Sequence, residues 1–455
     1  SPFEDETVRG LEVTCDDLNN MVMVRVYAED GVGNADYCLT FVQVQDNNGA
    51  CGAPAIGEIA GLMSTESVEA VEGVEVQLSG AQSMMYMTNH DGSYGFESLA
   101  EGGDFTVLPH KDVEPRNGVS TFDLILIQKH ILGSQLLDSP YKMIAADVNN
   151  SRSISTIDLI QLRKLILNVD QEFVNNTSWR FVDADYRFAD ATNPWLEAFP
   201  EVKNINNLDG TVLANFVAVK IGDVNESARA NAAQSLQPRS ITDVLELQTQ
   251  EVDMRSGNVY TISFSADISD IAGYQFTMEL DPQQVEILDL KQGIAKAENF
   301  GVFTEQGLIT SSYHQSESQE VKGQVLFSLT IRAKADAALS EVLGLSSRST
   351  EAEAYNFQDE DLALGLVIGD QSQTSEFALY QNSPNPFQAE TMISFKLPEL
   401  MEGMLEFKDI SGRTILLKEG DFAKGYNEVR LSADELPSAG VYFYTLHAGK
   451  YTATK

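Results

Sequence analysis

The residues whose types and spacing could do chemistry lie near the middle of the chain, in the twelve positions from Asp147 to Asp158. An aspartate opens this stretch, another closes it, and oxygen-bearing side chains occupy alternate positions between them. Calcium prefers six to eight oxygen ligands, which alternate residues of a tight loop can supply, so we predict a calcium loop. Its expected ligands are the side chains of Asp147, Asn149 and Ser151, the carbonyl of Ser153, a water-bridged Ser155 and the carboxylate of Asp158.

The loop belongs to a unit that occurs twice, because many residue types between 112 and 168 recur 35 positions later. A fixed offset of this kind indicates a duplicated supersecondary unit. The first copy is a poorer calcium loop, since Arg116 stands where a fifth-position oxygen is expected. Its expected ligands are Asp112, Glu114, an amide or carbonyl oxygen of Asn117, and Asp123.

Each predicted loop leads directly into a predicted helix, Leu124–Leu132 in the first copy and Leu159–Leu167 in the second. The alternative interpretation of each loop is a polar turn in which Asp or Ser caps the helix without a metal. Both helices are apolar on most sides, and such helices are normally covered. We expect a permanent partner, within the chain or tightly bound, although the core of the module itself is an alternative cover.

Residues 110–168 resemble type I dockerin modules, which pair two such loop–helix units back to back. The resemblance implies that loop positions ten and eleven recognise a cohesin partner. These positions are Thr121-Phe122 in the first copy and Thr156-Ile157 in the second, and both pairs are more apolar than is usual in that family.

Length and composition restrict the class of protein. The 455 residues predict about three to five domains, and 43% hydrophobic residues exclude global disorder. Thirty Lys and Arg against 68 Asp and Glu give a net charge of −38, which repels phosphate backbones and makes nucleic acid an unsuitable partner. No apolar run approaches the ~18 residues of a membrane helix, and no signal-peptide pattern opens the chain, so we expect a soluble protein whose signal, if it is exported, has been removed.

All three cysteines lie near the start of the chain, at Cys15, Cys38 and Cys51. A bridge between Cys15 and Cys38 would fasten a small sandwich and would imply an oxidising compartment. Buried free thiols are the alternative, because spacing alone does not fix connectivity. Cys51 is left without an assigned partner.

The segment around these cysteines has the pattern of a β-hairpin. Alternating apolar runs at 21–27 and 37–44 flank a Gly-rich turn at 31–34. Residues 1–50 are about half the length of an immunoglobulin-like sandwich, so we expect a partial domain of that type.

Nothing in the sequence has the spacing of an active site. The histidines are scattered singly, and no zinc motif, nucleophile elbow, phosphate loop or dinucleotide fingerprint is present, so we do not expect an enzyme. The five histidines are His90, His110, His130, His314 and His447.

The segments on either side of the repeat contain short predicted strands. Residues 54–109, with an Asp91-Gly92 turn, are similar to carboxypeptidase regulatory-like domains, which implies a seven-stranded sandwich without catalytic residues. Residues 170–227 predict an irregular extension packed on the dockerin-like module. Within it, Asp223-Val224-Asn225 resembles the opening of a further calcium loop, but no closing acid follows at the right distance. Residues 228–242 predict a linker.

Residues 243–369 contain predicted strands separated by turns. Together with the segments Gly273-Tyr274-Gln275-Phe276 and Leu280-Asp281-Pro282, these strands resemble a cohesin, which implies a jelly-roll sandwich. A dockerin-like and a cohesin-like module in one chain predict self-interaction, within the chain or head to tail between copies. The predicted strands are Val259–Ala266, Gly273–Leu280, Gln324–Ala333 and Leu362–Ile368.

The last segment, 374–455, carries the most diagnostic motifs. The order of Leu379–Phe387, Thr391–Pro398, Asp409–Thr414 and Gly440–Tyr444 resembles the C-terminal sorting domain of type IX secretion cargo in Bacteroidetes. The resemblance implies a small β-sandwich that the export machinery recognises. Family members usually end in one further basic and apolar strand, so the export state stays open, and a plain β-sandwich is the alternative.

These features predict a mostly β, multidomain chain of immunoglobulin-like and jelly-roll sandwiches with one small helical calcium module. We expect a secreted or cell-surface, non-enzymatic, calcium-stabilised protein with a structural or adhesive role, such as a filament or matrix subunit. The alternatives are the accessory region of a larger exported hydrolase and a glycan-binding module.

Overall fold

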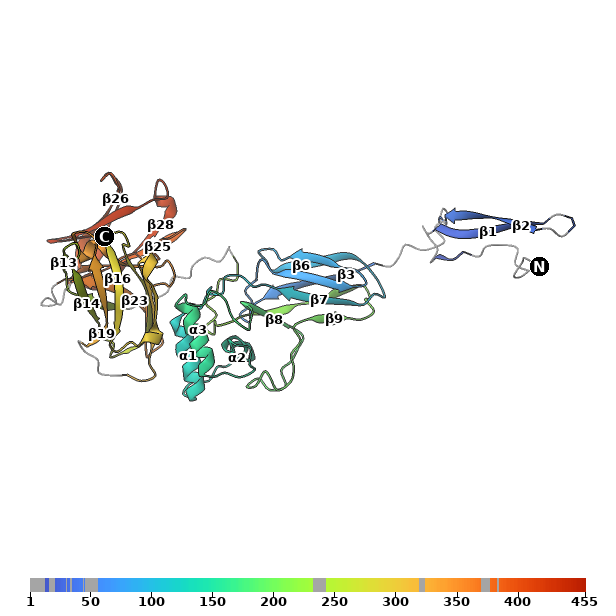
Figure 1. Cartoon of the computed structure of the whole chain (residues 1–455), viewed down its shortest axis with the longest axis horizontal. Coiled ribbons are helices and arrows are strands. Elements are labelled where there is room, and N and C mark those ends of the chain that lie inside the picture. Colours follow the sequence, from blue (N-terminus) through green and yellow to red (C-terminus); the bar gives the residue numbers. More distant parts are fainter. Residues whose placement is uncertain are drawn as a thin grey trace.

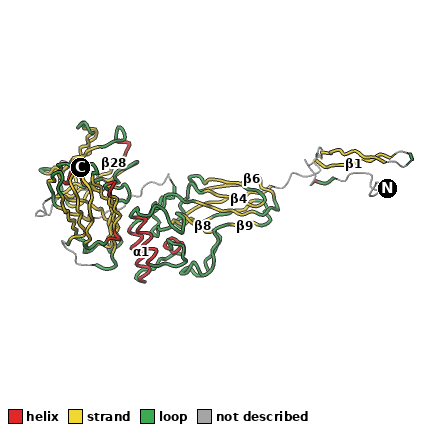
Figure 2. Tube along the Cα trace, viewed as in Figure 1, coloured by secondary structure: helices red, strands yellow, loops and turns green. Residues whose placement is uncertain are grey.

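The computed structural model describes residues 13–15, 21–29, 31–32, 35–43, 45, 56–231, 243–318, 324–369, 377–382 and 384–455. The described chain is mostly β, as predicted, and its main helices gather in one place between strand-rich regions (Figure 2). None of the helices in these ranges combines the length and the apolar character that crossing a membrane requires.

The N-terminal segment contains the predicted hairpin. Strands β1 (Met21–Glu29) and β2 (Ala35–Gln43) pair antiparallel throughout. Cys15 is disulfide-bonded, but the side chains of Cys38 and Cys51 lie outside the described residues. The Cys15–Cys38 pairing and the remainder of a partial immunoglobulin-like domain therefore stay predictions.

The first sandwich is built from two segments that are distant in the sequence. One of its sheets has the order β10-β3-β11-β8, with β6 also on β3, and the other has the order β5-β4-β7-β9. Strands β10 and β11 pair parallel with β3, a long-range pairing that local pattern does not reveal. The strands are β3 (Ile56–Ser64), β4 (Glu75–Gly80), β5 (Met84–Met87), β6 (Ser93–Ala100), β7 (Phe105–His110), β8 (Trp179–Asp183), β9 (Lys203–Ile205), β10 (Thr211–Leu213) and β11 (Phe216–Lys220).

This arrangement changes the bounds or contacts of three predicted segments. Residues 54–109 do not complete the sandwich alone, because the extension 170–227 adds strands to both of its sheets. The same extension, which was expected to be irregular but contains β8 to β11, also packs on the helices through Val182, Val219 and other apolar side chains. Ala228 and Ala230, at the start of the predicted linker, are buried in the core of the first sandwich.

The helical module, residues 110–168, is inserted between β7 and β8 and consists of α1 (Thr121–Leu132), α2 (Pro140–Ala146) and α3 (Thr156–Ile166). Ser120 and Ser155 cap α1 and α3, and each forms a capping box with the aspartate three residues later. Gly133 ends α1 in the left-handed conformation. Both helices of the predicted repeat are therefore present, and each begins slightly before its apolar run.

The large sandwich, residues 243–369, has its core around the stacked rings of Phe264, Phe276 and Phe327. The four strands predicted for this segment are all present. Its principal strands are β12 (Val244–Thr249), β14 (Val259–Ser265), β15 (Ile271–Leu280), β16 (Val285–Gln292), β17 (Phe300–Phe303), β18 (Leu308–His314), β19 (Val325–Ala333), β21 (Leu343–Ser346), β22 (Glu353–Asn356) and β23 (Asp361–Ile368); β13 (Asp253–Met254), β20 (Ala337–Ala338) and α4 (Leu339–Val342) are short.

The C-terminal sandwich, residues 377–455, has two sheets, ordered β24-β25-β28 and β27-β26-β29-β30, that enclose Phe395 and Phe407. It adjoins the large sandwich, since the Tyr380 hydroxyl donates to Glu246 at 2.6 Å. Its strands are β24 (Ala378–Leu379), β25 (Glu390–Leu397), β26 (Met401–Asp409), β27 (Thr414–Phe422), β28 (Gly425–Ser432), β29 (Tyr442–Ala448) and β30 (Tyr451–Thr454).

Candidate functional site

The helical module lies between the first sandwich and the large sandwich (Figure 1). Strands β15 and β18 of the large sandwich are buried along almost their whole length, on both faces. One face covers the core of the sandwich, and α1 packs on the other. We call the contacts of α1 and α3 with the large sandwich the docking interface.

Polar contacts anchor the start of α1. The backbone N–H of Thr121 donates to Oε1 of Gln275 at 2.6 Å, and the hydroxyls of Thr121 and Ser312 lie 2.7 Å apart. All three side chains are buried. The N–H groups in the first turn of a helix have no partner within the helix, so Gln275 satisfies a donor that burial would otherwise leave unpaired.

An apolar patch follows the polar anchor. The rings of Phe122 and Tyr355 stack with their centroids 5.2 Å apart, and Ile125 is buried with Ala272 in the same cluster. A Cβ at Gly273 would lie 3.0 Å from the side chains of both Ile125 and Thr121. Glycine at this position therefore permits the close approach of α1 to β15.

The end of α3 contacts the same face of the large sandwich. The hydroxyl of Thr350 donates to the carbonyl of Ile166 at 2.8 Å, and the hydroxyl of Thr310 donates to the carbonyl of Leu167 at 2.6 Å. The last carbonyls of a helix also lack partners within the helix. Two buried threonines of the sandwich thus satisfy the C-terminus of α3.

Charged groups lie at the edge of the interface. Lys129 of α1 forms an ion pair with Asp359 at 2.6 Å. Arg163 of α3 lies with Nη2 3.3 Å from Nδ1 of His314. Burial, together with the Arg163 guanidinium, lowers the pKa of His314 to about 3. His314 is therefore neutral at neutral pH and can accept a hydrogen bond from Arg163.

The two predicted recognition pairs have different surroundings. Thr121 and Phe122 are in the docking interface, as described above. Their counterparts after the second loop are exposed: Ile157 retains 54% of its accessible surface, and Ile160, the counterpart of Ile125, retains 51%. Only the first copy of the repeat presents this part of its helix to the large sandwich.

The predicted second loop folds tightly around Asp147, which is fully buried. Its two carboxylate oxygens accept from the backbone N–H groups of Ser151 and Arg152 at 2.8 and 2.7 Å. The carboxylate of Asp158, also fully buried, accepts from the N–H groups of Asn149 and Ser155 at 3.2 and 2.9 Å. The opening and closing aspartates therefore lie at the centre of one loop, as a calcium ligand set requires.

The carboxylates of Asp147 and Asp158 lie close enough in this loop to repel each other. Burial raises the pKa of Asp147, and the charge of Asp158 raises it further. Asn149, Ser151 and Ser153 add neutral oxygens at the loop surface, and the Ser151 hydroxyl donates to the Ser153 carbonyl at 3.2 Å. Across the described ranges, no three His, Cys, Asp or Glu side chains gather as a metal cluster, so this loop offers two carboxylates and otherwise neutral oxygens.

The residues predicted for the first loop are not arranged in this way. Asp112 is exposed and accepts from the N–H and hydroxyl of Ser178, both at 2.8 Å. The Asn117 side chain exchanges hydrogen bonds with the backbone of Arg229. Glu114 is exposed at a positive φ of 51°. The structure therefore does not fold 112–117 around Asp112 as it folds 147–152 around Asp147.

Asp123, the remaining predicted ligand of the first loop, faces a different segment. Its Oδ1 accepts from the N–H of Val224 at 2.8 Å, and it is fully buried. Burial and the charge of Asp223 raise the pKa of Asp123 to about 8, and burial raises the pKa of Asp223 to about 6.

Sequence reasoning missed the residues of the large sandwich that hold the helices. In β18, Thr310 and Ser312 alternate with core residues and would ordinarily face solvent. The available signal was the small hydroxyl side chains on a strand next to Gly273. This signal is weak, because an exposed strand has the same pattern.

No protein-family model matches the chain, and no curated protein matches its sequence. Among solved structures, a type I cohesin–dockerin complex from Clostridium thermocellum is 14% identical, with 29% of this chain and 98% of that chain covered and a TM-score of 0.24. The type II cohesin dyad of a scaffoldin from Acetivibrio cellulolyticus is 11% identical, with 37% of this chain and 61% of that chain covered and a TM-score of 0.23. A type II cohesin domain from the cellulosome of the same organism is 9% identical, with 27% of this chain and 92% of that chain covered and a TM-score of 0.22. Part of this mostly β chain is thus similar to cohesin structures.

Proposed function

We propose that this chain is a non-enzymatic, calcium-stabilised structural or adhesive protein that acts outside the cell. In this proposal the helical module is held on the large sandwich as a dockerin is held on a cohesin, but within one chain. The observation that carries the proposal is the docking interface, in which Thr121 and Ile125 of the first repeat are buried against the sandwich and Phe122 stacks on Tyr355.

The character of the interface supports a permanent attachment. Buried backbone groups of α1 and α3 find their partners on the large sandwich, so separation would transfer them to water together with the apolar patch around Ile125. Full burial of one large apolar side chain contributes roughly 1.5–3 kcal/mol. A contact of this kind between tethered domains is favoured further by the high effective concentration of the tethered partner.

A stiff junction suits a protein that transmits force or spans distance. The helical module is wedged between two sandwiches, and the Asp147 loop would hold calcium beside the junction. The C-terminal motifs, including Leu379–Phe387, support export through a type IX pathway and a place at the cell surface. Association of the helical module of one copy with the large sandwich of the next would join chains into filaments or a matrix.

Cutting the chain between the two docked parts tests the proposal. A specific protease site is placed between Asn231 and Asp243, and the cut chain is examined by size-exclusion chromatography in calcium. No disulfide can hold the fragments together, because all three cysteines precede the cut. The fragments are expected to co-elute, and fragments that separate at micromolar concentration would contradict the proposal.

The internal repeat supplies a matched control for this experiment. Phe122→Arg places a charge in the docking interface and is expected to separate the fragments, since burial of an unpaired charge is costly. Ile157→Arg makes the same change at the exposed counterpart and is expected to leave the fragments together. If both variants behave alike, the docking interface is not what holds the fragments.

A further inference from the structure

A second segment repeats the opening of the Asp147 loop. Asp223–Ser227 and Asp147–Ser151 share the pattern Asp-Val-Asn-x-Ser. The fourth residue of each has a positive φ, 60° at Glu226 and 55° at Asn150. The two segments are therefore alike in sequence and in backbone conformation.

The hydrogen bonds of the two segments also correspond. Asp223 accepts from the N–H groups of Ser227 and Ala228 at 3.1 and 2.8 Å, as Asp147 does from the residues four and five positions after it. Asn225 accepts from the N–H of Ser227 at 3.2 Å, and its counterpart Asn149 accepts the equivalent bond at 3.0 Å. Asp223 thus holds the first position of a loop like the Asp147 loop.

The second half of this loop comes from a segment about one hundred residues earlier. The hydroxyl of Ser227 donates to the carbonyl of Gly118 at 2.9 Å, which corresponds to the bond from Ser151 to the Ser153 carbonyl. Ser120 donates its N–H to Asp123 at 2.8 Å, as Ser155 does to Asp158 at 2.9 Å. Gly118, Ser120 and Asp123 therefore stand where the seventh, ninth and twelfth positions of the loop belong.

The burial of the two aspartates is a separate observation that favours a bound cation here. Asp123 is 0% exposed and Asp223 is 6% exposed, yet none of the ion pairs within the described residues involves either carboxylate. The nearby buried amine of Lys220 donates instead to the carbonyls of Pro115 and Ile221. Two carboxylates buried near each other are costly to ionise even with the Lys220 amine nearby, and N–H donors alone do not neutralise them.

We propose that these two segments form a second, discontinuous calcium site. Its ligands are the side chains of Asp223, Asn225 and Ser227, the carbonyl of Gly118, a direct or water-bridged Ser120 and the carboxylate of Asp123. This donor set of two carboxylates and several neutral oxygens matches that of the Asp147 loop and suits a hard divalent cation. The site joins the end of β11 to the start of α1, and so fixes the residues that dock on the large sandwich.

This inference rests on the calcium binding proposed above, and its test separates the two. The intact chain is stripped of metal and titrated with calcium in a calorimeter. The unmodified chain is expected to bind two ions. Asp223→Ala is expected to lose one binding event and Asp147→Ala the other. Asp112→Ala, which removes the sequence-predicted ligand of the first loop, is expected to lose neither.

Each other outcome has a defined meaning. Loss of one event in Asp112→Ala but not in Asp223→Ala would overturn the discontinuous site in favour of a continuous first loop. One ion in the unmodified chain, lost in Asp147→Ala, would also overturn it while leaving the Asp147 loop intact. No binding at all would overturn calcium binding itself.

A milder variant covers the case in which Asp223→Ala fails to fold. Asn225 is exposed, so Asn225→Ala removes a ligand without touching a core. It is expected to leave the circular dichroism spectrum unchanged and to weaken one of the two binding events about tenfold. Unchanged affinity at both sites would overturn the proposed ligand set.

Discussion

The two halves of the repeat share their residue types but differ in what surrounds them. The second half has a continuous loop from Asp147 to Asp158 and an exposed helix face at Ile157 and Ile160. The first half has its helix face buried against the large sandwich, and its closing Asp123 faces a distant segment. A repeat in sequence thus identifies a repeated unit, whereas long-range contacts decide what each copy does.

Arg116 illustrates how the two halves differ. It stands where the first loop would need an oxygen, and its guanidinium donates instead to the carbonyl of Ser349 in the large sandwich, at 3.3 Å. The same residue therefore disfavours a continuous loop and contributes to docking. In the discontinuous site that we propose, the Asp223 segment supplies the oxygens that 112–116 does not direct inward.

The largest expected effect comes from breaking the continuous loop. Asp147→Ala removes a buried carboxylate ligand and should abolish the part of the calcium stabilisation that the Asp147 loop supplies. At calcium a thousandfold above Kd, that stabilisation is about 4 kcal/mol. Thermal unfolding with and without a chelator measures it. A variant that gains as much stability from calcium as the unmodified chain would show that Asp147 is not a ligand.

The next largest effect is expected at Ile125, by comparison with its counterpart Ile160 in the second copy of the repeat. Ile125→Ala should destabilise the docked state by about 2–4 kcal/mol, because it leaves a cavity in the interface. Ile160→Ala, on the exposed face of α3, should change stability by less than about 0.5 kcal/mol. Fragment affinity after cleavage at the inserted site measures both. Equal effects would remove the distinction between the two halves.

A smaller effect concerns pH. The folded pKa of His314 lies below its ordinary value, so the folded chain binds fewer protons than the unfolded chain between about 3 and 6.5. Stability should therefore fall as the pH falls below 6.5, by about 2 kcal/mol at pH 5. Denaturant titrations of the native chain and of His314→Gln at pH 7 and pH 5 isolate the contribution of His314 to this loss of stability. Identical pH dependence of stability in the two proteins would exclude a contribution from His314.

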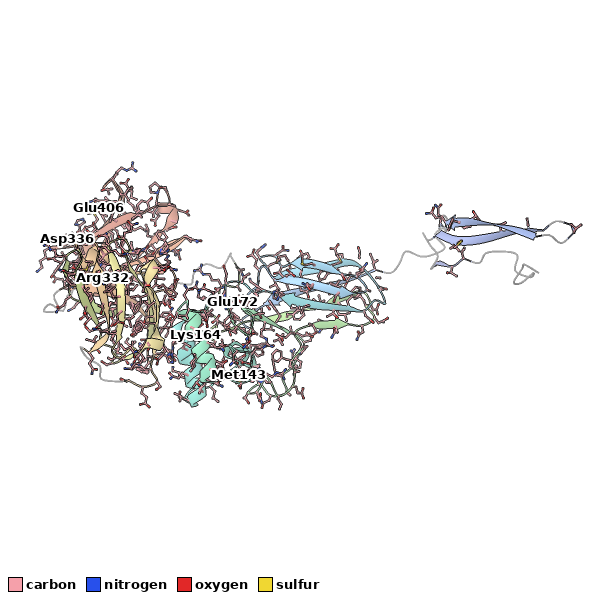
Figure 3. All side chains as sticks on the ribbon, viewed as in Figure 1. Met143, Lys164, Glu172, Arg332, Asp336 and Glu406 are labelled. Atoms are coloured by element: carbon pink, nitrogen blue, oxygen red, sulfur yellow. The ribbon has the colours of Figure 1, made fainter. Side chains whose placement is uncertain are left out.

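The smallest effect concerns the lysines of the repeat. Lys129 pairs with Asp359 at the interface edge, whereas its counterpart Lys164 is exposed on the helical module (Figure 3). Lys129→Ala should weaken fragment association by up to about 1 kcal/mol, and less in high salt. Lys164→Ala should have no measurable effect. A stronger effect from Lys164 would place the interface on the other side of the module.

The local features of this fold were predictable from sequence. Ser120 and Ser155 signal helix starts, and Asp147 with its alternate oxygens signals a loop, because both depend on residues close in the chain. The pairing of β3 with β10 and β11 depends on residues about 150 positions apart and has no local signature.

The difference between local and long-range contacts also explains which parts of the candidate sites were predictable from sequence. Asp223 has the local pattern that opens a loop, but the closing acid of the proposed site, Asp123, precedes it by one hundred residues. A pattern that runs forward along the chain therefore contains no closing acid. Gln275 and Ser312 form no motif at all. Their role follows only from the face of the sheet on which α1 lies.

The central claim is that the first repeat docks on the large sandwich of its own chain. An engineered disulfide tests this claim most directly, because the hydroxyls of Thr121 and Ser312 are in contact. The pair Thr121→Cys and Ser312→Cys should oxidise to a bond within one chain, found by peptide mapping of a non-reduced monomer. The counterpart pair Thr156→Cys and Ser312→Cys should not. A bond that forms only between chains, or forms equally in the counterpart pair, would contradict the account.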